Sequence, residues 1–236
     1  MDLYHALNRG VDKRAIFLDD RDRARFVHDM YEFNSTERAI NSGRSCPTNT
    51  NTSTRTTTAM IDVGRQSLER GGDQIVSIHG WCLMDNHYHL LLSPRVENGL
   101  SLFLKKLNGG YAKYFNERYV RSGALFQGKT KKIQVENDSH FLHILNYIHL
   151  NPLDREIRTK AWRQGNLNNV AAALQLLGSY RWSSYRDYAG IKNFPSILTT
   201  SLFEDVFEHA YAKKLEKYLS SMKLSEIQHL FLEKEA

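Results

Sequence analysis

A short β-hairpin that carries two histidines constrains most strongly how this chain folds. Residues 75–84 and 87–93 are rich in strand-forming residues and are separated by Asp85 and Asn86, which tolerate turn conformations. Alternate side chains of a strand share a face, so His87 and His89 point the same way and are able to grip one ion together. The pattern therefore predicts a tight hairpin with an imidazole pair on one side.

A second stretch, residues 145–152, adds a phenol and an amide. Tyr147 and Asn151 are four residues apart, so a helix places them on one face, and Pro152 closes that helix. Two imidazoles, an amide oxygen and a phenol beside a metal indicate an enzyme that cuts a phosphodiester with tyrosine. Each part also has a plainer explanation: hydrogen-bonded strand histidines, a half-buried core tyrosine and a helix-ending asparagine.

The hydrophobic pattern predicts alternating strands and helices. The helix that contains Tyr147 has Asp138 as its expected cap and an apolar stripe from Phe141 to Ile148, with Tyr147 on the opposite stripe. The expected elements are a strand at 3–9, a helix at 19–33, the hairpin strands, a helix at 100–119, an extended basic stretch at 124–135, the helix before Pro152, and a helical remainder that is clearest at 203–222. This order predicts an α+β fold, an antiparallel sheet with helices packed on one face.

One segment breaks the pattern. Residues 41–58 contain thirteen Ser, Thr or Asn in eighteen positions and no large apolar side chain. Such a segment cannot bury enough surface to offset the entropy lost on ordering. We therefore predict a flexible polar insertion from about residue 37 to about residue 73.

Positive charge is concentrated in residues 101–135. Eight cations and one acid, Glu117, give this stretch +7, so the rest of the chain sums to −1 within a net charge of +6. Aromatic residues interleave with the cations, which suits single-stranded nucleic acid, although a solvated helix face with core aromatics gives the same pattern. The predicted DNA-binding residues are Lys105, Lys106, Lys113, Arg118, Arg121, Lys129, Lys131 and Lys132.

Composition narrows the class of protein. The chain has 236 residues, enough for one well-buried domain with an appendage or for two small domains, and its mean hydropathy is −0.52. No run of 18 apolar residues occurs, and the first residues lack the pattern of a secretory signal, so we expect no membrane partner. Cys46 and Cys82 form no metal-type spacing, which favours two free thiols in a reducing cytoplasm.

Seven sequence blocks together resemble a known family. They occur in order as YHALNRG, IFLDDRDRARFV, NHYHLLL, YAKYFNERY, GALFQGK, NYIHLNP and WSSYRDYAG, over residues 4–34 and 75–190. They resemble the REP-associated tyrosine transposases, which are the transposase-like branch of the single-tyrosine HUH nucleases (His-hydrophobic-His). The resemblance implies a ferredoxin-like domain in a bacterial, nucleoid-associated protein that cuts single-stranded DNA near hairpins through a 5′-phosphotyrosine link and leaves a free 3′-OH.

Matching positions carry the family's site onto this chain. The resemblance implies that His87 and His89 bind the metal, that Asn151 is the third ligand and that Tyr147 is the nucleophile. Two imidazoles and an oxygen fit Mn²⁺, or Mg²⁺ by abundance, better than a structural zinc. The expected partner is single-stranded or hairpin DNA, bound by a monomer or a homodimer.

Three departures from the family pattern accompany these matches. Asp85 stands where relatives have proline, Lys129 stands where arginine is usual and removes a bidentate phosphate contact, and the insertion is additional. We expect residues 1–190 to form the transposase-like nuclease domain and residues 191–236 to form a helical extension. Two other classes remain open: a domesticated DNA-binding protein that no longer cuts, and a metallohydrolase that uses Asp85 with the histidines and a water nucleophile.

Overall fold

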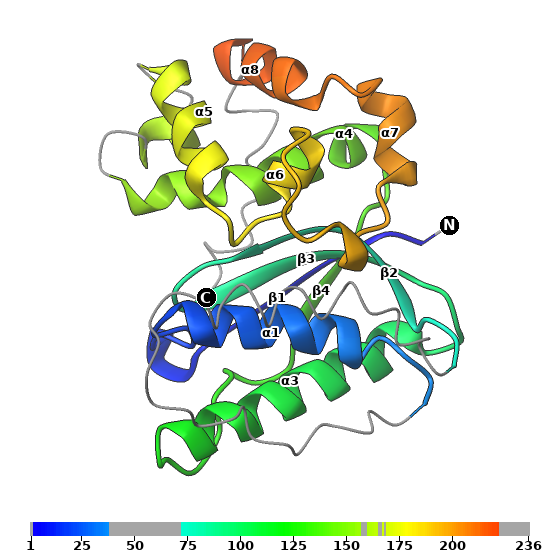
Figure 1. Ribbon diagram of the computed structural model, residues 1–236. Helices are drawn as coiled ribbons and strands as arrows, with labels where there is room; N and C mark the ends of the chain where they lie inside the picture. The colour runs from blue at the N-terminus through cyan, green and yellow to red at the C-terminus, as the bar shows by residue number, and fades with distance from the viewer. Residues whose placement is uncertain (1, 38–71, 157–159, 165–166, 168, 222–236) are drawn as a thin grey trace.

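The fold is centred on one four-stranded antiparallel sheet (Figure 1). Its strands are β1 (Tyr4–Arg9), β2 (Val76–Leu83), β3 (His87–Pro94) and β4 (Lys131–Gln134), in the spatial order β2-β3-β1-β4. The computed structural model describes residues 2–37, 72–156, 160–164, 167 and 169–221. The predicted hairpin is confirmed, because β2 pairs with β3 across the turn at Asp85 and Asn86.

Two helices cover one face of the sheet, as expected for a ferredoxin-like fold. They are α1 (Asp20–Glu32) and α3 (Gly99–Arg118). The Asp19 side chain caps α1 by accepting a hydrogen bond from the Asp22 amide at 3.0 Å. Their apolar stripes close over the strands in a core that includes Phe26, Phe103 and Tyr88.

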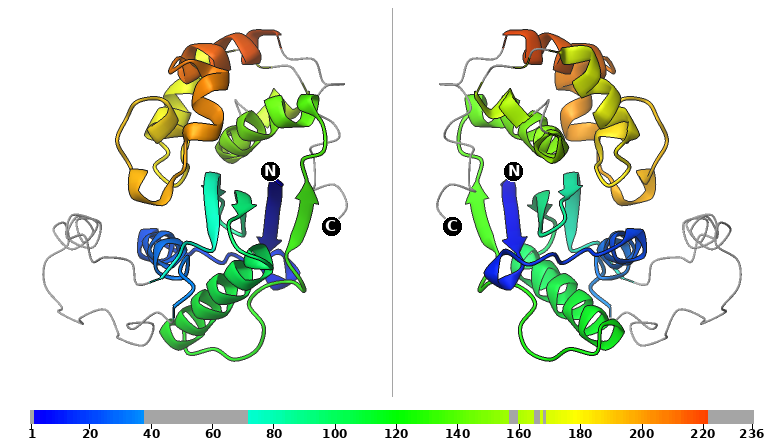
Figure 2. Two further views of the ribbon diagram at one scale, coloured as in Figure 1. Left: turned by 90° about the vertical axis from the view of Figure 1, so that its right-hand side faces the viewer. Right: turned by 90° about the vertical axis from the view of Figure 1, so that its left-hand side faces the viewer.

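The second face of the sheet is covered as well, so the expectation of helices on one face only is corrected (Figure 2). This layer contains α4 (Asp138–Leu150), α5 (Val170–Ser179), α6 (Tyr185–Tyr188), α7 (Ser201–Phe207) and α8 (Tyr211–Ser221). The reason lies in the strands: all eight residues of β2 are buried, so neither of its faces meets solvent. The α+β class and the antiparallel sheet are confirmed.

Gly80 allows α4 to lie directly on the sheet. A Cβ at this position would lie 2.6 Å from the end of the Leu145 side chain of α4, so a larger residue would require that side chain to move. Helix α4 is consequently packed between the sheet and the C-terminal helices. Tyr147 is therefore buried like Ile144 and Ile148, so the stripe predicted opposite the apolar one is also covered by protein.

Several element ends differ from the sequence prediction. The cap of α4 is Asn137, whose side chain accepts from the His140 amide at 2.7 Å, and Asp138 is the first helical residue. The expected helix at 203–222 is two helices, because Glu208 and His209 have positive φ angles of 47° and 55° and turn the chain between α7 and α8. Short 3-10 turns lie at η1 (Val11–Lys13), η3 (Asn151–Arg155), η4 (Lys160–Gln164) and η5 (Pro195–Ile197).

The predicted polar insertion lies almost wholly outside the described residues, which stop at 37 and resume at 72. The boundary expected after residue 190 stays a prediction. Helices α7 and α8 nevertheless share one apolar cluster with α4 and α5, in which Phe203 and Leu215 pack with Leu145 and Leu177. None of the helices in the described part of the chain is both long and apolar enough to cross a membrane.

Candidate active site

The two predicted histidine ligands share the face of β3 that meets α4. The rings of His87 and His89 are 5.0 Å apart, edge to face. His87 is half-buried and His89 is fully buried. The period-two alternation of a strand therefore predicted this pair correctly as neighbours.

A third histidine joins them from the adjacent strand. His5 in β1 lies on the same face, because Leu7 is the register partner of His89 and His5 is two residues further along. Its Nε2 lies 2.9 Å from Nδ1 of His89, and the two rings stack with centroids 5.1 Å apart. The sequence prediction omitted His5 from the site because strand register is not written in either strand alone.

Tyr147 meets this cluster from the opposing layer. Its ring lies edge-on to His89 at 5.8 Å and to His5 at 5.9 Å, with Trp162 at 6.2 Å on another side. The side chain is only 1% exposed. Tyr147 and His89 thus lie together, although they are 58 positions apart in the sequence and were predicted separately, one in a helix and one in a strand pair.

Asn151 is joined to Tyr147 rather than directly to the histidines. Its Nδ2 donates to the Tyr147 carbonyl at 2.8 Å, and its Oδ1 accepts from Nη2 of Arg163 at 2.8 Å. The same guanidinium lies over the Tyr147 ring, 5.4 Å from its centroid, with Nη1 3.4 Å from the phenolic oxygen. Arg163 therefore holds the predicted nucleophile and the predicted third ligand together.

Arg163 is itself fixed by Asp154. Its Nη2 and Nε lie 2.5 Å and 2.8 Å from one carboxylate oxygen, and Trp162 Nε1 donates to the other at 2.8 Å. This cluster comes from η3 and η4, which follow α4 along the chain. Arg163 could not be predicted as part of this site, because no periodic pattern in the sequence links it to Tyr147.

Asp85 is occupied by cations from two other elements. Arg23 of α1 donates to its carboxylate at 2.5 Å, and Arg155 of η3 forms a second ion pair with the same oxygen. Together the two arginines connect the hairpin turn to α1 on one side and to η3 on the other. This use of the carboxylate disfavours the metallohydrolase reading, in which Asp85 would bind metal beside the histidines.

Three of the eight predicted DNA-binding cations are committed to internal contacts. Arg118 bonds to Asp19 and Asp22, each at 2.5 Å, and these hydrogen bonds hold the pKa of its guanidinium above the usual value. Lys106 donates to the backbone carbonyls of Ser35 and Glu37, just after the end of α1. Arg121 donates to the side chain of Asn116 at 2.7 Å.

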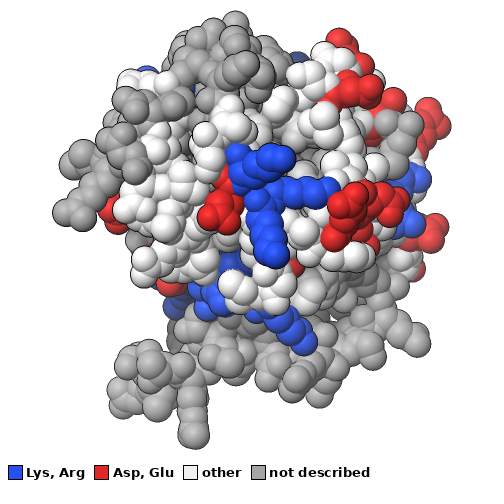
Figure 3. All heavy atoms as spheres, turned by 90° about the horizontal axis from the view of Figure 1, so that it is seen from above, with Lys and Arg blue, Asp and Glu red and all other residues white. Residues whose placement is uncertain are grey.

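The other five cations are exposed: Lys105, Lys113, Lys129, Lys131 and Lys132. Within β4, Lys131 pairs with Leu7 and so lies on the histidine face, whereas Lys132 lies on the opposite face and donates to Ser101 at 3.0 Å. Their contact with DNA stays a prediction. The surface over α7 and α8 carries one group of basic side chains with acidic ones on either side, so it is not uniformly basic (Figure 3).

The interleaved aromatic residues belong to the core and not to a stacking surface. Phe103, Tyr111 and Phe115 are buried, and the hydroxyls of Tyr114 and Tyr119 donate to Asp22. Burial raises the pKa of Tyr114 to about 12. The alternative reading of this stretch, a solvated helix face above core aromatics, therefore holds for α3.

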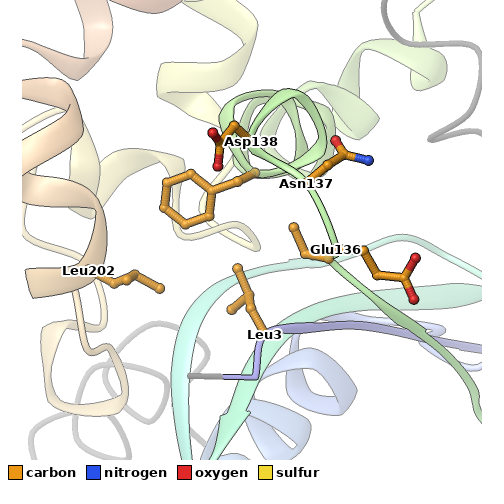
Figure 4. A pocket seen from close by; sticks show the side chains of 7 residues that line it. Leu3, Glu136, Asn137, Asp138 and Leu202 are labelled. Atoms are coloured by element: carbon orange, nitrogen blue, oxygen red, sulfur yellow. The ribbon is translucent and has the colours of Figure 1, made fainter.

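A pocket of about 160 Å³ lies at the other end of α4 (Figure 4). Leu3, Phe141 and Leu202 supply apolar walls, and Glu136 and Asp138 supply carboxylates. It contains none of the predicted site residues. The pocket is therefore separate from the histidine–tyrosine site. Its two carboxylates also make it unsuited to a phosphate group.

Comparisons with known proteins bear on the same residues. A solved structure titled "Structure of the REP associates tyrosine transposase bound to a REP hairpin" aligns with 84% of this chain and 84% of its own chain, at 10% identity and a TM-score of 0.44. A search of curated protein sequences found no match. The family model described as "Transposase IS200 like" matches residues 58–151. The matched residues include the histidine pair, Tyr147 and Asn151, so over this stretch the chain is similar to the IS200-like transposases.

Proposed function

We propose that this protein is a metal-dependent single-stranded DNA endonuclease and strand transferase of the REP-associated branch, which acts near DNA hairpins through Tyr147. The observation that carries the proposal is the meeting of Tyr147 with two histidine rings within 6 Å and with the Arg163 guanidinium over its face. A phenol, imidazoles and a cation are the groups that tyrosine-mediated phosphodiester cleavage requires.

The donor atoms around Tyr147 fit a divalent cation. The imidazoles of His87 and His89 converge on one side of the sheet, and imidazole suits Mn²⁺ and related ions. Asn151 supplies an amide oxygen, which would have to exchange its Arg163 hydrogen bond in order to bind the ion. A bound Mg²⁺ or Mn²⁺ would polarise the scissile phosphate and offset its developing negative charge.

The chain's own residues account for the remaining chemistry. An ordinary phenol is protonated at neutral pH, and the Arg163 guanidinium beside the hydroxyl stabilises the negative charge that forms when the proton leaves. The Tyr147 oxygen then bonds to phosphorus, the bond from phosphorus to the 3′ oxygen breaks, and that oxygen takes up a proton. The phosphotyrosine link keeps the bond energy, so a 3′-OH is able to rejoin DNA without ATP.

Trapping a covalent adduct tests the proposal. Wild-type protein is incubated with 3′-labelled hairpin DNA and Mn²⁺, and the expected result is label that stays on the protein in SDS. Tyr147→Phe removes a single oxygen and should give no labelled protein. Tyr111→Phe is the matched control, because Tyr111 is equally buried and its hydroxyl donates to the Ile16 carbonyl in the other core. An adduct on Tyr147→Phe would refute the assignment.

A second candidate, a DNA-binding protein that does not cut, is favoured by one observation. Tyr147 is buried, and Arg163 occupies the Asn151 oxygen, so both groups are engaged within the protein. This candidate predicts hairpin binding by wild-type protein with no adduct under any divalent cation. The same labelling experiment therefore separates the two functions.

A further inference from the structure

The hydrogen bond between His5 and His89 assigns a role to a residue outside the predicted ligand set. We propose that His5 positions His89, so that His89 presents Nε2 to the metal. This inference rests on the proposed function, since it concerns the same metal site. It adds a positioning residue and names the ligating atom.

The register of the sheet brings the two rings together. Leu7 lies opposite His89, and His5 is its diagonal neighbour on the same face, at a distance that imidazole rings are able to span. Nε2 of His5 is 2.9 Å from Nδ1 of His89, and both side chains are buried. The contact is therefore a strand-to-strand hydrogen bond in a site with little water.

The chemistry of imidazole decides what this contact does. A metal-binding nitrogen carries no proton, and in neutral imidazole the other nitrogen then carries it. With Nε2 of His89 as the proposed metal-binding nitrogen, Nδ1 carries the proton, so it donates to His5 Nε2, which accepts. Nε2 of His89 is left as the nitrogen without a proton, directed away from His5.

His5 acts on His89 and not as an additional ligand. Its Nε2 is used by His89, and in the described part of the chain no three His, Cys, Asp or Glu side chains converge as a metal site. A partner that fixes the ring and tautomer of a ligating histidine typically changes metal affinity by about 10–100-fold when it is removed. The His5 ring also lies edge-on to Tyr147, so the same side chain lines the nucleophile.

Mn²⁺ binding to four variants tests the inference. His5→Leu should weaken Mn²⁺ affinity by about 10–100-fold, while His5→Gln, whose amide oxygen accepts from Nδ1, should recover most of it. His79→Leu is the matched control: His79 is buried in the neighbouring β2, and its imidazole bonds to Ser93 at 2.7 Å and to the Thr199 carbonyl at 3.0 Å. It should lower the melting temperature and leave Mn²⁺ affinity unchanged. His89→Ala should abolish tight binding.

Nitrogen-15 spectra of the histidines report the tautomer of His89 directly, and a change in stability alone does not alter that tautomer. In metal-free wild-type protein His89 should carry its proton on Nδ1, and His5→Leu should release the ring to the other tautomer. A proton on Nε2 of His89 in the wild type overturns the inference even where His5→Leu fails to fold. Unchanged Mn²⁺ affinity in folded His5→Leu, with affinity lost in His89→Ala, overturns the inference alone. Wild-type protein that binds no Mn²⁺ overturns the proposed function as well.

Discussion

At the scale of single residues, Asp22 shows how a basic patch in a sequence becomes an internal ion pair. Asp22 is 0% exposed, and it accepts hydrogen bonds from Tyr114, Tyr119 and the Leu18 amide. Arg118 supplies the compensating charge at 2.5 Å. The cation is held there because a buried carboxylate without a partner is costly.

We therefore expect Arg118→Gln to act mainly on the fold: it should lower the free energy of unfolding and change the affinity for DNA little. Removing one partner of a buried pair costs about 3–5 kcal/mol, and the Arg118 side chain is 22% exposed, so the lower end is expected. Urea denaturation measures this change in the free energy of unfolding. Lys113→Gln is the control, since Lys113 and Glu117 are each 68% exposed and 3.9 Å apart, and it should change stability by less than about 0.5 kcal/mol. Equal stabilities of the two variants would place Arg118 outside the core network.

The site residues divide by the kind of information that the sequence holds. His87 with His89, and Tyr147 with Asn151, were predicted as neighbours because residues two apart in a strand and four apart in a helix share a face. His5 and Arg163 were missed because their contacts depend on the register of β1 against β3 and on the path of the chain after α4. Local spacing predicts neighbours within an element, and packing decides the neighbours between elements.

At the scale of elements, β4 separates two lysines that look equivalent in the sequence. Lys131 lies in one row with Leu7 and His89 across three strands, at about 4.8 Å per strand. Lys132 points to the opposite face, toward Ser101 at the start of α3. Of these two lysines, Lys131 is thus the one on the face of the sheet that carries His89.

We predict that Lys131→Gln weakens binding to single-stranded DNA of any sequence and lowers the salt slope by about 0.7, the value for one phosphate contact. Binding is measured by fluorescence anisotropy at several salt concentrations. Lys132→Gln is the matched control on the other face and should change the slope much less. A salt slope lowered by about 0.7 in Lys132→Gln and unchanged in Lys131→Gln would mean that DNA binds the opposite face of the sheet.

The elements themselves were largely predictable, and the exceptions have local causes. The hairpin follows from two strand-forming runs around a turn, α1 from its acidic cap and apolar stripe, and α3 from its apolar stripe. The break between α7 and α8 was missed because Phe203, Phe207 and Tyr211 continue one stripe at a spacing of four, while Glu208 and His209 turn the backbone. Side-chain periodicity does not register a change of φ at two polar residues.

At the scale of the whole molecule, a buried polar network joins the sheet to α4 and to α8 in the second helical layer. His149 of α4 is bonded on Nδ1 to the Tyr211 hydroxyl of α8 and on Nε2 to the Ser184 hydroxyl, each at 2.7 Å. Ser184 Oγ in turn accepts a hydrogen bond from the Trp81 amide of β2 at 2.9 Å, and Tyr211 donates to Asn146. Helix α8, which follows residue 190, is therefore hydrogen-bonded to α4, the helix that carries Tyr147.

This network makes stability depend on pH. Burial lowers the pKa of His149 to about 3 and, less strongly, that of His79. An unfolded histidine titrates near 6.5, so between about pH 6.5 and pH 3 the unfolded state binds the additional proton and stability falls as the pH falls. For one such group the slope is at most about 1.4 kcal/mol per pH unit.

Urea denaturation of His149→Gln between pH 7.5 and pH 4.5 isolates this contribution. The variant loses hydrogen bonds and is less stable at pH 7.5, but it has no group to protonate at this position. The difference in unfolding free energy between wild type and variant should therefore narrow as the pH falls below 6.5. His209→Asn is the control: His209 is exposed, asparagine tolerates its positive φ, and its difference from wild type should stay constant with pH. A gap for His149→Gln that stays equally wide at pH 4.5 would mean that His149 takes up its proton inside the folded protein, and the buried network would then have to accommodate a charge that its neutral hydroxyls and amide cannot balance.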